Sequence, residues 1–402
     1  MVVLFTAQAL LLTSNVTFIA INALAGASLT AHPMLATLPI AMQALASALT
    51  SYPASQLMAR VGRRAGFSIG AAFGAVGSLV AAWGMASHSL VLLCVGTFMA
   101  GVYNGMGQYL RFAAADAAQQ FKPSFKAQAI AIVLAGGVVG GVIGPESAKL
   151  TRSAMDTAFL ATYLSLAGFA LLALAVMQLM RLDTLAPVQG TSPAAPTAPS
   201  TNKSSALGTE TSAVMTVGEV LSNPTVLAAV LCGAVAYGSM NLLMVATPLA
   251  MQVCGYSFNQ TAWVIEWHVI AMFAPGFFTG KLNDRFGVRP MMFAGGALSM
   301  AAAAINISGT SVWHFWCALV LLGLGWNWLF TGATTLLTST YNPASKARVQ
   351  GINDTIVFST LVFSSLSSGV LVASYGWVLM NGVCLAVIAL AMGVLWRMGK
   401  TA

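Results

Sequence analysis

The chain has 402 residues, of which 58% are hydrophobic and only 6% are charged, and its formal net charge is +8. This small number of charged side chains cannot cover a soluble core. The composition therefore excludes a soluble globular protein and indicates that lipid surrounds most of the chain. Apolar runs of about 20 residues favour helices over a membrane β-barrel, whose strands show ten-residue alternation. The five cysteines are odd in number and lie in apolar segments, so they do not form a disulfide framework.

The hydrophobic segments predict an all-α membrane protein with twelve transmembrane helices in two six-helix halves. The N-terminal half comprises residues 1–182 and the C-terminal half residues 219–402. The expected spans are 2–28, 34–59, 66–86, 89–113, 127–147 and 156–180, then 222–251, 259–280, 290–309, 312–337, 347–373 and 376–397. Between the halves, residues 183–218 are rich in Pro, Ala, Ser and Thr, which predicts a flexible linker.

The basic residues predict the orientation. All of the 17 Lys and Arg except Lys149 and Arg152 flank spans on one side or lie in the linker. By the positive-inside rule this side is cytoplasmic, so both termini and the linker are expected there. This distribution accounts for the net charge without a nucleic-acid partner.

Two similar stretches follow the second span of each half and are expected to be loops, namely SQLMARVGRR at Ser55–Arg64 and GKLNDRFGVR at Gly280–Arg289. At these residues, and in its number of spans, the chain resembles the major facilitator superfamily. The second copy matches that family's G-x-L-x-D-R-x-G-x-R motif, which implies gating roles for Gly280, Asp284, Arg285, Gly287 and Arg289. The first copy departs from the motif, with Ser55 in place of the glycine and Ala59 in place of the acid.

Two adjacent spans carry soft metal donors at helical spacing, Met240-x-x-x-Met244 and His268-x-x-x-Met272. A spacing of four residues places both members of a pair on one helix face. Thioether sulfur and neutral imidazole together suit Cu(I). Met240 and His268 are expected at a similar depth, close to the midplane where transporters of this kind bind their substrates. Cys232, two turns before Met240 on the cytoplasmic side, is expected to bind a soft ion next along its path.

Here the chain also resembles the copper importers of the superfamily, the CcoA type, which supply copper for assembly of cbb3-type cytochrome c oxidase. The resemblance rests on MNLLM at 240–244, HVIAM at 268–272, and the flanking Cys232 and Cys254. It implies copper, as Cu(I), as the transported substrate and no prosthetic group. It also implies a protein of the bacterial inner membrane that delivers to a cytoplasmic copper chaperone or an exporting copper ATPase. A monomer is expected, because one chain holds both halves of an alternating-access pair.

Two other interpretations remain open. One is a proton-coupled exporter of an amphipathic organic compound, in which Met240, Met244, Trp263 and Trp267 line an apolar cavity. The other is a copper sensor or assembly factor that does not transport. Ionisable residues inside spans are functional candidates by default, so Glu146, Glu266 and Asp354 are candidates for carrying coupling protons. A hydrogen-bonded structural acid is the favoured alternative for Glu266, and pairing with Arg348 or a helix N-terminus would account for Asp354. The glycines of the fifth span, from Gly136 to Gly144, suit either close packing or bending.

Overall fold

The structure, a computed structural model, describes residues 1–121, 126–180, 217–341 and 345–398. All secondary structure in these ranges is helical. The linker predicted for residues 183–218 lies outside the described part except for its last two residues. These two residues begin a short helix, α8 (Val217–Ser222).

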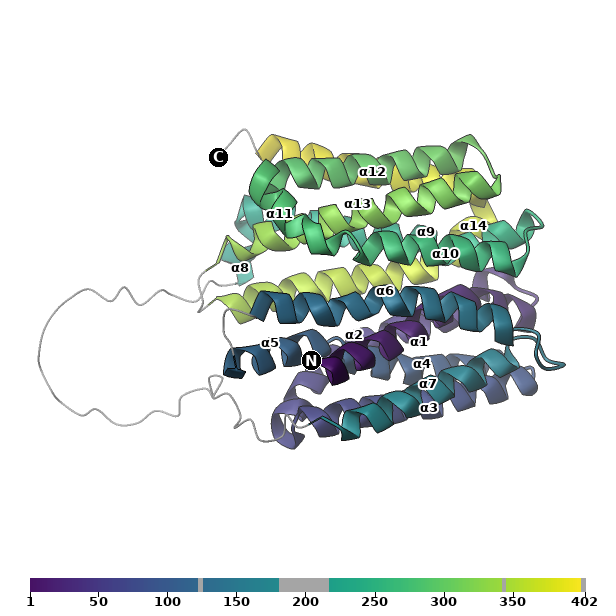
Figure 1. Cartoon of the computed structure of the whole chain (residues 1–402). Coiled ribbons are helices and arrows are strands. Elements are labelled where there is room, and N and C mark those ends of the chain that lie inside the picture. Colours follow the sequence, from purple (N-terminus) through teal and green to yellow (C-terminus); the bar gives the residue numbers. More distant parts are fainter. Residues whose placement is uncertain (122–125, 181–216, 342–344, 399–402) are drawn as a thin grey trace, which may run out of the picture.

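The first half is built from seven α-helices and one 3₁₀ turn (Figure 1). They are α1 (Val2–Leu29), η1 (Pro33–Leu35), α2 (Leu38–Val61), α3 (Arg63–Ala86), α4 (Leu90–Gly107), α5 (Leu110–Phe121), α6 (Lys126–Thr151) and α7 (Leu160–Gln178). The fourth expected span, 89–113, is thus divided into α4 and α5, and α5 continues to Phe121.

The second half follows α8 and consists of α9 (Pro224–Val253), α10 (Phe258–Phe273), α11 (Gly276–Phe286), α12 (Val288–Ser308), α13 (Val312–Thr338) and α14 (Lys346–Met398). The 53 residues of α14 are two helices that meet at Gly376, whose φ of 79° and ψ of 171° are not helical. The eighth span was predicted as one helix over 259–280. It is instead bent by 45° between α10 and α11, at Ala274 and Pro275.

Nine helices in the described ranges are long and apolar enough to cross a membrane, or ten when α10 and α11 count as one span. Division of α14 at Gly376 adds one more, and the 26-residue α6 completes the twelve. The all-helical twelve-span architecture is therefore confirmed. Helices α5 and α11 and the turn between α2 and α3 lie at one end of the bundle, which is on the left in Figure 1. They carry Arg111, Lys281, Arg285 and Arg63, so we call this the basic end.

The sequence repeat is also a repeat of backbone conformation. In each copy the first residues extend the preceding helix, which is α2 or α11, and the stretch is not the loop that the pattern predicts. Each copy then breaks at a glycine, Gly62 with φ 86° and ψ 159°, and Gly287 with φ 87° and ψ 152°. This region of backbone space is essentially restricted to glycine. The break lets α3 and α12 begin directly after the turn.

The glycines of α6 form two packing faces. A Cβ added at Gly136, Gly140 or Gly144 would come within 2.9 Å of backbone atoms of α1. A Cβ at Gly137 or Gly141 would come within 2.8 Å of Leu12 of α1 or Val269 of α10. Small residues at such positions let helices approach closely in lipid. The close-packing interpretation therefore accounts for these glycines, because one helix contacts both α1 in its own half and α10 in the other.

We predict that Gly287→Ala lowers the free energy of unfolding by about 1–3 kcal/mol, because a Cβ strains the backbone at this φ and ψ. Gly280→Ala is the matched control in the same motif. It is helical, and an added Cβ there meets nothing within 4 Å. It should leave stability unchanged or raise it by up to about 1 kcal/mol. Thermal unfolding in detergent measures both variants, and equal losses would contradict the assigned role of Gly287.

Candidate functional site

A cavity of about 560 Å³ lies between the two halves. Helices α1, α2, α4, α5 and α6 line it from the first half, and α9, α10, α11, α13 and α14 from the second. Gln8, near the start of α1, and Thr334 and Thr335, in the last turns of α13, are among its lining residues, so the cavity extends toward the basic end. Its size falls within the range of about 300–1,000 Å³ that is usual for small-molecule sites.

The second half contributes an aromatic wall, which we define as Tyr237, Phe273, Trp326 and Phe330. The rings of Trp326 and Phe330 are nearly parallel, with centroids 5.4 Å apart and an interplanar angle of 7°. Tyr237 meets each of them edge-on, at 5.4 Å and 5.0 Å. Phe273 lies 6.3 Å from Trp326. Such a cluster holds its rings in fixed orientations and presents a polarizable surface to a flat ligand.

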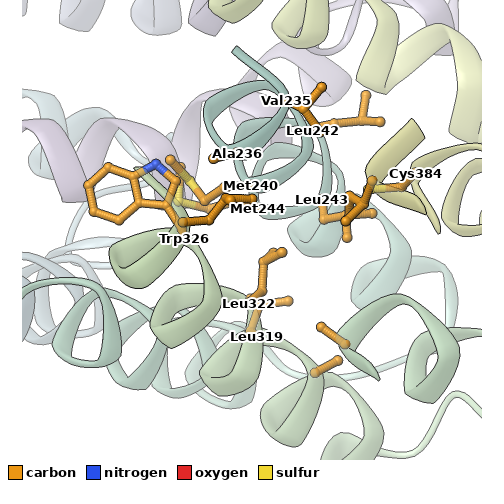
Figure 2. Packing of buried hydrophobic residues seen from close by; sticks show 14 of the residues in the cluster. Val235, Ala236, Met240, Leu242, Leu243, Met244, Leu319, Leu322, Trp326 and Cys384 are labelled. Atoms are coloured by element: carbon orange, nitrogen blue, oxygen red, sulfur yellow. The ribbon is translucent and has the colours of Figure 1, made fainter. Parts of the chain in front are cut away.

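Methionines extend the aromatic wall. Met240, Met244 and Met272 all line the cavity. Figure 2 shows Met240 and Met244 beside the indole of Trp326, on the helix that faces it. Thioethers adapt their shape and make favourable contacts with aromatic rings, so these residues complete an apolar surface.

The first half contributes an amide wall, which we define as Asn15, Gln43 and Asn104, with Ser47 beside them. Gln43 Nε2 donates to Asn15 Oδ1 at 3.0 Å, and Asn104 Nδ2 donates to Ser47 Oγ at 3.1 Å. Ser47 Oγ in turn reaches the backbone carbonyl of Gly101 in α4 at 2.9 Å. These bonds hold α1, α2 and α4 together and fix the amides in place. Among the described lining residues, only Arg111 carries a side-chain charge.

Two further amides hold the second half around the cavity. Asn241 Nδ2 donates to the hydroxyls of Ser364 and Ser365 at 2.8 Å each, which ties α9 to α14. Asn327 Nδ2 donates to the backbone carbonyl of Met272 at 2.7 Å. That carbonyl lies at the bend between α10 and α11, where an unpaired acceptor would be costly. Asn327 therefore stabilises the bend.

The structure separates the predicted metal ligands. His268 is fully buried behind the cavity lining, and its Nδ1 lies 2.7 Å from the backbone carbonyl of Leu319. Cys232 is buried in the core of the second half, and Cys254 is exposed at the end of α9. Only the three thioethers of the set face the cavity. In the described part of the chain no group of three or more His, Cys, Asp and Glu is placed to hold a metal ion.

Trp263 and Trp267, which the organic-exporter interpretation places in the cavity lining, lie outside the cavity. Trp263 stacks on Trp316 at 5.7 Å with an interplanar angle of 15°, and it meets Trp313 edge-on at 5.9 Å. Trp267 meets Trp316 edge-on at 6.0 Å. The four rings form a cluster between α10 and α13, and none of them lines the cavity.

The end opposite to the basic end is closed between the halves. Lys149 of α6 pairs with Glu146 on its own helix at 2.5 Å and with Glu266 of α10 at 3.6 Å. Arg152 stands over the rings of Phe159 and Phe258, 5.6 Å and 5.0 Å from their centroids. Glu266 thus has a basic partner from the other half. Asp354, the third candidate for a coupling proton, is exposed and accepts a bond from Asn353.

The residues with predicted gating roles lie at the basic end. Gly280, Asp284 and Arg285 are exposed on α11, and Arg289 is half-buried in the first turn of α12. The described part of the chain contains no ion pair of Asp284. The first copy of the motif lacks the acid but still forms an ion pair, because Arg63 binds Asp116 of α5. The acid is supplied by another helix, which the repeat alone could not reveal.

Comparison with known proteins finds similar transporters and solved structures of the same fold. The riboflavin transporter RfnT of Brucella anthropi is 38% identical over 392 residues, which cover 97% of this chain and 93% of that protein. The uncharacterized transporter YddS of Bacillus subtilis is 27% identical over 94% of this chain and 86% of that protein. The xylose transporter XylE of E. coli, in a partially occluded inward-open conformation, superposes with a TM-score of 0.69 over 98% of this chain and 96% of that chain, at 11% identity.

These comparisons correct the copper interpretation. A relative that is 38% identical over nearly the whole chain is a riboflavin transporter, so copper import, metal binding and a role in oxidase assembly are wrong predictions. The resemblance to the CcoA type rested on short motifs, whereas the similarity to RfnT extends over the whole chain. Transport of an organic compound, the alternative interpretation, is better supported.

The wider family is established independently of the substrate. The model of the Major Facilitator Superfamily matches residues 4–265 and 229–401, which together span almost the whole chain. The twelve helical spans, the paired motif glycines and the cavity between two halves agree with this match. This chain belongs to the major facilitator superfamily.

Proposed function

We propose that this protein carries riboflavin, or a closely related flavin, across the membrane by alternating access. The observation that carries the proposal is the cavity with an aromatic wall on one side and an amide wall on the other. The isoalloxazine ring of a flavin is flat and aromatic, and its edge bears carbonyl oxygens, ring nitrogens and an imide N–H. Its faces suit Trp326 and Phe330, and its edge suits Asn15 and Gln43. The similarity to a riboflavin transporter supports the same substrate.

Charge supports this choice. Riboflavin is neutral, and Arg111 is the one charged side chain among the described lining residues. An ion would lose hydration in such a cavity without a matching counter-charge, whereas a neutral amide edge exchanges water for amide partners. The ribityl chain, which carries hydroxyls, suits the polar residues toward the basic end, such as Thr334 and Gln108.

We propose further that the basic end faces the cytoplasm of a bacterium, in its inner membrane. The clustering of Lys and Arg at that end supports this orientation. The cavity reaches the same end, and the opposite end is closed by Lys149 and Glu266. In this orientation the structure corresponds to an inward-open state. The three thioethers Met240, Met244 and Met272 are proposed as apolar contacts of the flavin.

We predict that a riboflavin-auxotrophic bacterium grows on low riboflavin when it expresses this protein, and that purified protein in vesicles accumulates riboflavin. Trp326→Leu should weaken riboflavin binding about tenfold or more, because stacking on an aromatic ring contributes about 1–3 kcal/mol. Quenching of flavin fluorescence by the protein in detergent measures this affinity.

The matched control is Trp313→Leu on the same helix. Trp313 is exposed away from the cavity, in the cluster with Trp263 and Trp316. Its replacement should leave riboflavin affinity unchanged. Failure of the parent protein to bind or move riboflavin would refute the proposed function. Equal losses in both variants would refute the role of the aromatic wall.

Gating by the second copy of the motif remains a prediction. Asp284 is exposed here, as expected if it pairs only when the basic end closes. Asp284→Asn should therefore leave riboflavin binding in detergent within about twofold and lower vesicle transport about tenfold, which corresponds to a barrier about 1.4 kcal/mol higher. Asp284→Glu, which keeps the charge, should retain most transport. Normal transport by Asp284→Asn would remove the residue from the gate.

A further inference from the structure

Four polar side chains form a continuous hydrogen-bonded chain from the interior of the first half to the cavity. The Tyr163 hydroxyl of α7 lies 2.7 Å from Asn22 Oδ1 of α1. Asn22 Nδ2 lies 3.4 Å from Gln43 Oε1 of α2, and Gln43 Nε2 lies 3.0 Å from Asn15 Oδ1. Tyr163 and Asn22 are fully buried, whereas Gln43 and Asn15 line the cavity.

The buried phenol determines which way this chain of amides points. An amide can be turned end for end, so Asn22, Gln43 and Asn15 could in principle all be reversed together. In the reversed arrangement Asn22 would donate to Tyr163, and the phenolic hydrogen would be left in the interior without an acceptor. Asn22 is the hydrogen-bond partner that the described structure gives this hydroxyl. An unsatisfied buried donor is costly, so Tyr163 donates and each amide donates onward.

The consequence appears at the cavity. Because Asn15 Oδ1 accepts the bond from Gln43, the free end of Asn15 is its NH₂ group. Asn15 is half-buried and lines the cavity, so this group is available to a ligand. Unlike an isolated surface amide, it cannot adapt by turning over, because Asn22 and Gln43 would have to turn with it and the Tyr163 hydroxyl would lose its acceptor.

We propose that Asn15 is a fixed hydrogen-bond donor to an acceptor atom on the substrate edge. We also propose that Tyr163, in the interior, is a positioning residue that determines which end of the Asn15 amide faces the cavity. This inference rests on the proposed function and deepens it. The isoalloxazine edge carries two carbonyl oxygens and two unsubstituted ring nitrogens as acceptors, against one N–H donor. A wall that presents a fixed donor therefore selects flat, acceptor-rich heteroaromatic compounds over aromatic compounds of similar shape without such acceptors.

The donor role is tested at Asn15 alone. Asn15→Asp keeps the size of the side chain and still accepts the bond from Gln43, but its carboxylate has no donor. It should weaken riboflavin binding about tenfold, as should Asn15→Leu, because each loses one hydrogen bond to the ligand and Asp also faces its acceptor. Riboflavin affinity is measured by fluorescence quenching in detergent. Unchanged affinity in Asn15→Asp would overturn the donor assignment.

The positioning role is tested with a double-mutant cycle. Tyr163→Phe removes the hydrogen that orients the amides, so a fraction of molecules will present Asn15 Oδ1 to the cavity. Riboflavin affinity should fall about three- to fivefold, which is less than in Asn15→Leu. The hydrogen bond from Asn22 to Gln43 is long, at 3.4 Å, so it passes on only part of the preference for one orientation of Asn15. In the Asn15→Leu background, Tyr163→Phe should have no further effect on affinity.

The outcomes separate this inference from the proposed function. If the parent protein does not bind riboflavin, both the proposed function and this inference are refuted. If it binds riboflavin but the two replacements weaken affinity independently, Tyr163 acts only through stability, and the positioning role is overturned. Tyr256→Phe is the control, because its hydroxyl donates to the carbonyl of Thr310 far from the chain of amides. It should leave affinity unchanged.

Discussion

The contact of α6 with the backbone of α1 is the constraint on which the rest of the structure depends. Lipid supplies no hydrophobic force between helices, so close van der Waals packing must hold them together. Gly136, Gly140 and Gly144 permit this approach, and Gly137 and Gly141 on the adjoining face receive side chains from α1 and from α10 of the other half. One helix thus fixes both the packing within a half and the spacing between halves. The cavity begins beside this contact, where Leu134 and Ala135 of α6 enter its lining.

The two halves contribute different chemistry to that cavity. The amide wall belongs to α1, α2 and α4, and the aromatic wall to α9, α10 and α13. A compound that needs both walls is bound most tightly when the halves are close together around it. Such a difference in affinity between conformations is what allows a ligand to shift a conformational equilibrium. In the proposed transport by alternating access, the separation of polar and apolar surfaces between the two halves would therefore link recognition to movement, which a site built on one half alone could not do.

The sequence predicted the fold well and the site poorly, for definite physical reasons. Hydropathy and the flanking charges identify spans, because lipid imposes them one helix at a time. The spacing of Met240 with Met244, or of His268 with Met272, gives a helix face but not what that face meets. His268 turns toward Leu319 of α13 and leaves the cavity to the thioethers. Soft-donor spacing cannot distinguish a metal site from an apolar wall. The amides Asn15, Gln43 and Asn327 were detectable as polar residues within apolar spans, but their partners lie on other helices.

The closure at the end opposite to the basic end also bears on how fast such a carrier can work. Its polar part is the contact of Lys149 with Glu266 at 3.6 Å, assisted by Arg152 over two rings. A partly exposed ion pair contributes about 0–1 kcal/mol. Phe159 and Phe258 are buried, and a cation over a ring contributes about 0.5–2 kcal/mol, depending on its desolvation. These polar contacts therefore add little depth to the energy well of the closed end. Because each additional 1.4 kcal/mol of depth would slow opening about tenfold, weak contacts at this end favour rapid turnover.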